Sequence, residues 1–132
     1  MLRSDRMTGP RPAAESAGTF FLVLIGPGAA AVTAWTHGGL GLAGVALAFG
    51  CVLVAAIYTL GHISGAHFSP AVTIAFGIGR RMAWRDVGPY GLAQLVGAVL
   101  AESLERMAVE KRVCAIGAAY TENPTPSPSW CW

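Results

Sequence analysis

The chain has 132 residues, of which 54% are hydrophobic and only 12% are charged. Residues 16–79 contain no Asp, Glu, Lys or Arg, and a soluble domain with so few surface charges would aggregate. The formal net charge of +2 is too small to indicate a nucleic-acid partner. The composition therefore favours a protein whose main partner is a lipid bilayer.

Two apolar runs are long enough to cross a membrane, which takes about 20 helical residues. We expect helices over about residues 15–36 and 40–62, after an N-terminal segment of residues 1–13. One alternative is a buried hairpin of a soluble protein. Another is a secretory signal, since arginines precede the first run and AAAVTA resembles a cleavage site. The first run exceeds a usual signal core and a second follows at once, which favours two retained helices.

The placement of arginines predicts how these helices are oriented. Loop 36–40 has no arginine, whereas the arginines that flank the apolar region are Arg3, Arg6, Arg11, Arg80, Arg81 and Arg85. By the positive-inside rule, residues 1–13 and the loop after residue 79 are cytoplasmic. The segment between residues 61 and 80 then begins and ends on the same side of the membrane, so it is not a full span.

That segment reads GHISGAHFSPAVTIAFGIGRR and contains signals for a short helix. Ser69 can cap a helix N-terminus, Pro70 fits its first turn, and Gly77 and Gly79 supply a stop. A helix over residues 70–79 covers about half a bilayer at about 1.5 Å per residue. We therefore expect a re-entrant half-helix, with a file of water solvating the carbonyls of the unwound residues before it.

Four stretches, in order, resemble the aquaporin or major intrinsic protein family. SGAHFSPAVTIAF is similar to the first family signature, S-G-x-H-x-N-P-A-V-T, and AESAGTFFLVLIG, AGVALAFG and YGLAQLVGA resemble the family's first three helices. The resemblance covers about residues 13–101. It implies an all-α membrane protein in which residues 14–105 form the first repeat of the aquaporin-like fold. This repeat has three transmembrane helices, the third over about residues 85–105, plus the half-helix.

The resemblance also implies a set of pore-lining residues. They are Phe49, Gly65, Ala66, His67 and Ser69, and the signature itself is Ser69, Pro70 and Ala71. Ser69 replaces the family's asparagine, so its hydroxyl either donates to water in the pore or only caps the half-helix. Without the resemblance, the usual role of a lone histidine such as His67 is structural. The phenylalanine at position 49 resembles the aromatic residue that water-selective members of the family carry in the narrow part of the pore.

Glu15 and Gln94 are the remaining polar candidates in the apolar region. The resemblance implies that both are buried braces that support the backbone of the pore loop. The alternative for Glu15 is an interfacial carboxylate that favours the dipole of the first helix. Cysteines at positions 51, 114 and 131 show no metal-ligand spacing, and we expect neither a metal nor a cofactor.

The family pattern stops near residue 101, where ESLERMAVEKR brings six charges in eleven residues. We expect residues 106–132 to be a divergent, disordered tail, because TENPTPSPSWCW lacks apolar periodicity. The second family signature and its helices are absent, and inverted repeats are usual in such folds. These departures suggest a truncated or frame-shifted product.

We expect a passive water channel in the plasma (inner) membrane, with a cytoplasmic N-terminus. Its expected partners are the bilayer, water or small neutral solutes, and other copies as a tetramer or a complementary half-channel. The alternative is a non-conducting fragment of an aquaporin or glycerol facilitator. An enzyme is not expected, because HISG around Ser64 lacks the G-x-S-x-G pattern of a serine hydrolase.

Overall fold

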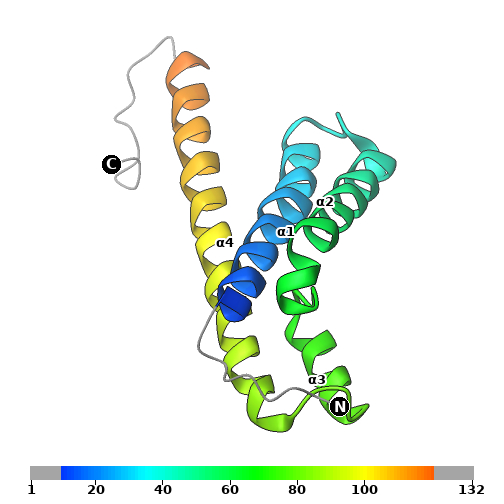
Figure 1. Cartoon of the computed structure of the whole chain (residues 1–132). Helices are drawn as coiled ribbons and strands as arrows, with labels where there is room; N and C mark the ends of the chain where they lie inside the picture. The colour runs from blue at the N-terminus through cyan, green and yellow to red at the C-terminus, as the bar shows by residue number, and fades with distance from the viewer. Residues whose placement is uncertain (1–9, 121–132) are drawn as a thin grey trace.

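The computed structural model describes the backbone of residues 10–120 and the side chains of residues 10–108. These residues form four helices and no strand: α1 (Pro10–Trp35), α2 (Gly41–Ser64), α3 (Pro70–Ile78) and α4 (Trp84–Tyr120). Figure 1 shows α1 between α2 and α4, with α3 lying beyond the C-terminal end of α2. Within the described chain, α1 packs against both α2 and α4, and α3 packs against α4. The fold is therefore all-helical, with α1 as its central helix.

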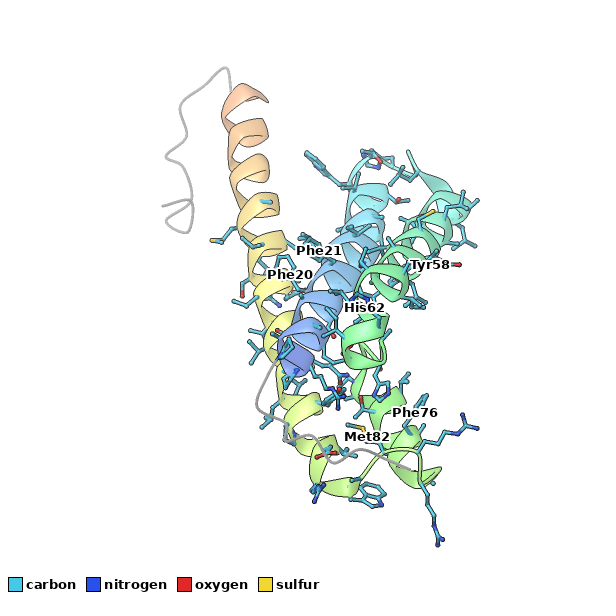
Figure 2. All side chains as sticks on the ribbon, viewed as in Figure 1. Phe20, Phe21, Tyr58, His62, Phe76 and Met82 are labelled. Carbon is cyan, nitrogen blue, oxygen red and sulfur yellow. The ribbon has the colours of Figure 1, made fainter. Side chains whose placement is uncertain are left out.

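Helices α1 and α2 form an antiparallel hairpin that suits a lipid environment. Among the described helices, these two are long and apolar enough to cross a membrane. Large apolar side chains on α2 face outward, including Leu42 and Tyr58, which are 87% and 83% exposed. Tyr58 points away from α1 (Figure 2). Such a surface is stable in hydrocarbon and would aggregate in water.

Small residues let the backbones of α1 and α4 approach closely. A β-carbon on Gly97 of α4 would collide with the carbonyl oxygen of Ser16 and would lie 3.2 Å from the backbone nitrogen of Phe20. Close approach at small residues is how membrane helices gain packing contacts, because burial of apolar surface supplies little driving force in lipid. The contact fixes the position of α4 along the first half of α1.

The helix bounds differ from expectation mainly at the outer ends. The second helix and the half-helix lie within two residues of the expected 40–62 and 70–79, whereas α1 begins at Pro10 instead of about residue 15. Proline is compatible with a first turn, where its missing N–H has no helical partner. Residues 1–9 and 121–132 lie outside the description.

Helix α4 continues well past its expected end at about residue 105. The structure is helical through Tyr120. The expectation of a disordered tail that begins at residue 106 is therefore corrected for residues 106–120. The charged residues after residue 101 are good helix formers. Arg106 and Glu102 also pair one turn apart at 2.9 Å. The part of the expected tail from residue 121 onward lies outside the described residues.

Candidate functional site

The buried polar side chains gather around the connection between α2 and α3, which we call the polar loop (residues 64–69). The buried polar side chains among the described residues are Glu15, Thr19, Ser64, Thr73 and Gln94. Ser64 belongs to the loop itself, and the other four reach it from α1, α3 and α4. Because polar groups in an apolar interior are stable only when paired, this clustering indicates one connected network.

Glu15 holds the backbone of the polar loop. Its Oε1 accepts a hydrogen bond from the N–H of His67 at 3.0 Å, and its Oε2 accepts one from the N–H of Phe68 at 2.7 Å. The side chain is completely buried, which excludes the alternative of an exposed interfacial carboxylate. Two charge-assisted bonds to adjacent amides fix the direction of the loop where it approaches α3.

Gln94 connects α4 to the same carboxylate. Its Nε2 donates to Glu15 Oε2 at 2.8 Å and to the Oγ1 of Thr73 at 2.9 Å. A carboxylate only accepts hydrogen bonds, so it fixes the orientation of the Gln94 amide group. The side chains of Glu15, Gln94 and Thr73 therefore link α1, α4 and α3 around the loop, as expected of two bracing residues.

The carbonyl groups at the two ends of the polar loop are hydrogen-bonded within the protein. The Ser64 carbonyl accepts a bond from the hydroxyl of Tyr90 at 2.9 Å, and the Phe68 carbonyl accepts one from the hydroxyl of Thr19 at 3.1 Å. The Ser69 carbonyl accepts bonds from the backbone N–H and the hydroxyl of Thr73. These bonds hold the two ends of the loop in place.

The three carbonyls in the middle of the loop are different. Within residues 10–120, no hydrogen bond reaches the carbonyl oxygens of Gly65, Ala66 or His67. Gly65 is exposed and the other two residues are partly exposed. A peptide carbonyl at membrane depth needs a partner, and here the partner must come from outside the described residues.

The backbone of the loop is held in an uncommon conformation. Gly65, Ala66 and Phe68 have φ angles of 94°, 55° and 50°, in the left-handed region that costs energy for residues with a β-carbon. Phe68 is 2% exposed, and its ring lies against Gly18, where any β-carbon would collide with it. Burial of this ring, together with the hydrogen bonds of Glu15, stabilises the strained turn.

Ser69 begins α3 but does not cap it through its side chain. The residue is extended, with φ −152° and ψ 133°, and Pro70 occupies the first turn, as expected. The hydroxyl makes no capping hydrogen bond to the helix, so the structure does not favour the alternative in which Ser69 only caps α3. In the extended conformation adopted before Pro70, the partly exposed hydroxyl is available to another partner.

The remaining expected pore residues lie in two places. The ring of His67 lies 4.5 Å from that of Phe76 and 5.5 Å from that of Tyr90, and its Nδ1 is 3.3 Å from Thr73 Oγ1. The His67 side chain is thus packed beside the loop. Phe49 is on α2, where its ring lies against Gly26 of α1 and remains 39% exposed.

Sequence reasoning missed three residues that contact the polar loop: Thr19, Thr73 and Tyr90. Helical spacing could have identified two of them, because Thr19 follows Glu15 by four residues and Tyr90 precedes Gln94 by four. Residues four apart share a helix face. Thr73 lies in the quoted signature but was assigned no role. No cluster of metal-binding side chains occurs in the part of the chain that the structure describes.

Residues 8–127 match the family model described as Major intrinsic protein. The chain belongs to this family. The match passes residue 101, where the motif-based resemblance ended. Residues beyond that point, including the charged part of α4, therefore belong to the region that the family model matches.

Aquaporins from plants and bacteria are among the similar proteins. Aquaporin NIP1-1 of Oryza sativa subsp. japonica is 45% identical over 94 residues, which cover 71% of this chain and 33% of the relative. Aquaporin Z of Rhodopseudomonas palustris is 45% identical over 92 residues, which cover 69% of this chain and 38% of the relative. The chain thus spans between a third and two fifths of the length of these curated relatives. Family membership and two apolar helices make it an integral membrane protein.

Proposed function

We propose that this chain forms part of the wall of a membrane channel for water, and that the polar loop lies inside the membrane beside the water path. The relatives named as aquaporins support a channel. Phe49, which resembles the aromatic residue of water-selective members, supports water over glycerol as the substrate. Transport of this kind is passive and requires no covalent chemistry, so no enzymatic activity is proposed.

The observation that carries this proposal is the row of three carbonyls at Gly65, Ala66 and His67, which accept no hydrogen bond within residues 10–120, between loop ends that are hydrogen-bonded to the protein. Carbonyl oxygens in a pore replace part of the hydration of a permeating molecule. If lipid covered them, each would lose a hydrogen bond at a cost of several kcal/mol. Water is the partner that removes this cost.

The start of α3 supplies positive charge and a hydrogen-bond donor to the proposed water path. Its N-terminus carries a partial positive charge of about half a proton, which disfavours cations and protons. The hydroxyl of Ser69 is not used for capping and can donate one hydrogen bond to a water oxygen. Ser69 has one donor where the family's asparagine has two, so its hold on that oxygen is weaker.

The complete pore requires a second wall, because Gly65 of the polar loop is exposed and Ala66 and His67 are partly exposed in this chain. We propose that the other wall comes from a complementary half or from further copies of the chain, with a tetramer as the expected assembly. We propose that the chain lies in the plasma membrane with its N-terminus on the cytoplasmic side, and the arginine distribution supports this orientation. Labelling of Leu40→Cys by an impermeant thiol reagent from outside intact cells would support this orientation, and labelling only after lysis would contradict it.

The test is osmotic shrinkage of liposomes that contain the purified chain. We expect shrinkage several times faster than in protein-free liposomes of the same lipid, and a return to the lipid rate with Ser69→Leu, whose side chain fills the path. Ser103→Leu is the matched control, because Ser103 is exposed on α4 and should leave the rate unchanged. Shrinkage at the lipid rate by the wild-type chain would contradict the proposal and support the non-conducting alternative.

A further inference from the structure

The connection between α3 and α4 carries exposed cations beside exposed apolar side chains. We call it the basic turn and define it as Ile78, Arg80, Arg81 and Trp84. Figure 2 labels Met82 within the same turn and Phe76 on α3 just before it, at the end of the molecule opposite the α1–α2 loop. We propose that the basic turn binds the headgroup of an anionic phospholipid.

The backbone of the basic turn is fixed by hydrogen bonds that end α3. The N–H groups of Gly79, Arg80 and Arg81 donate to the carbonyls of Ala75, Gly77 and Phe76 at 2.9–3.1 Å. Arg80 adopts a left-handed φ of 54°, which these bonds stabilise. The two arginines therefore leave a preformed turn, and binding a ligand there costs little backbone entropy.

The charges of Arg80 and Arg81 are not neutralised within the described residues. Ion pairs there join Arg85 to Asp86 at 3.7 Å and Arg106 to Glu102 at 2.9 Å, and neither includes Arg80 or Arg81. Both side chains are exposed. Two adjacent guanidinium groups without an acidic partner suit the oxygens of a phosphate diester, which arginine binds with two parallel hydrogen bonds.

The apolar part of the turn indicates a lipid rather than a soluble phosphate. Ile78 is 69% exposed and Trp84 is 62% exposed. The Trp84 ring lies over Gly77, where a β-carbon would be 3.6 Å from it, so α3 supports one face of the indole. An indole at headgroup level and an aliphatic side chain toward the acyl chains are typical of a membrane interface.

The location of the turn agrees with this ligand. Arginine placement puts residues 80–85 on the cytoplasmic side, where anionic lipids give the membrane a negative surface potential. Each arginine near such a surface adds to the attraction, and the attraction weakens over a Debye length of about 8 Å at physiological ionic strength. A single anionic lipid at this turn would hold the start of α4 at headgroup level.

The experiment measures which lipid lies next to Trp84. The full chain, with Phe in place of Trp35, Trp130 and Trp132, is placed in phosphatidylcholine–phosphatidylglycerol vesicles in which one lipid at a time is brominated, and quenching of Trp84 fluorescence is recorded. We expect brominated phosphatidylglycerol to quench several times more strongly than brominated phosphatidylcholine at equal mole fraction. High salt should reduce this preference.

Paired variants separate charge from shape. R80Q/R81Q should remove most of the preference, R80K/R81K should keep most of it, and R106Q on α4 should leave it unchanged. Equal quenching by the two lipids in the wild-type chain would overturn the proposal. So would a preference that R80Q/R81Q retains, or one that soluble glycerol phosphate abolishes, because the ligand would then be a free anion. This experiment measures lipid binding and not water flow. Its result can therefore be interpreted even if the channel proposal fails.

Discussion

At the scale of single residues, Glu15 is the residue on which the polar loop depends most. Its carboxylate is completely buried and accepts three hydrogen bonds, from two loop amides and from Gln94. A carboxylate suits this position because it accepts hydrogen bonds at both oxygens and donates none. An amide of the same size would place an N–H group against one of the donors.

Glu15→Gln should therefore destabilise the folded chain without changing its volume. We expect the free energy of unfolding to fall by about 2–5 kcal/mol, because buried donors lose a charged acceptor. Unfolding in mixed detergent micelles, followed by circular dichroism, measures the change. Glu102→Gln is the control, since its exposed carboxylate pairs with the exposed Arg106 on the same helix and its loss should cost less than about 1 kcal/mol. Equal losses in the two variants would contradict the bracing role.

The sequence indicated Glu15 and Gln94 as candidates for this site, but it did not indicate Thr19 and Tyr90, which hydrogen-bond to the same loop. Glu15 and Gln94 stand out because polar side chains are rare in apolar runs, and both contact the site as expected. The hydrogen bonds of Thr19 and Tyr90 to loop carbonyls depend on how the helices are rotated about their axes. No local pattern specifies that rotation, although four-residue spacing suggests the shared faces.

At the scale of helices, the packing of α4 against α1 depends on the absence of a side chain at Gly97. A β-carbon there would meet backbone atoms of Ser16 and Phe20, which cannot rotate away as a side-chain tip can. The two helices would have to separate. Separation would also pull Gln94 away from Glu15, since these residues lie on the same pair of helices.

Gly97→Ala should lower the stability of the chain by about 2–3 kcal/mol through overpacking, although alanine is the better helix former. Gly91→Ala on the same helix is the control, because no atom lies within 4 Å of a β-carbon at that position. The control should be neutral or raise stability by up to about 1 kcal/mol. Thermal unfolding of both variants in the same detergent provides the measurement. A stability of Gly97→Ala equal to that of the control would show that the α1–α4 contact is looser than described.

Helix ends were predictable only where the sequence contains a chemical stop. Ser69-Pro70 and the glycines after residue 76 mark both ends of α3, and its predicted bounds agree with the structure to one residue. The expected end of α4 near residue 105 came from the family resemblance, which stops where charges appear after residue 101. Charged residues limit membrane insertion but do not end a helix, which is why α4 continues to Tyr120.

At the scale of the whole molecule, two exposed surfaces of the described chain bear on the proposed function. One consists of apolar faces, with Tyr58 and Leu42 on α2 as examples. The other is the polar loop, with three carbonyls that accept no hydrogen bond from the described residues. The proposed function assigns lipid to the first surface and water to the second, because each solvent satisfies the groups it covers.

The family was predictable from four short motifs in order, and the match over residues 8–127 confirms it. The extent of the family region was not predictable, because the last of the four motifs, YGLAQLVGA, ends at Ala98. The sequence pattern had placed the boundary near residue 101. The family match passes that point, and the helix of the structure does so as well.

The central claim is that water, and not lipid, covers the polar loop inside the membrane. Its most direct test replaces the native cysteines at positions 51, 114 and 131 with serine and introduces one cysteine at Ser69 or at Tyr58. N-ethylmaleimide in the aqueous phase reacts with the thiolate, and a thiol ionises only where water reaches it. In proteoliposomes we predict modification of Ser69→Cys and little reaction of Tyr58→Cys, although Tyr58 is 83% exposed. An unreactive Ser69→Cys, or equal rates at the two positions, would contradict the claim.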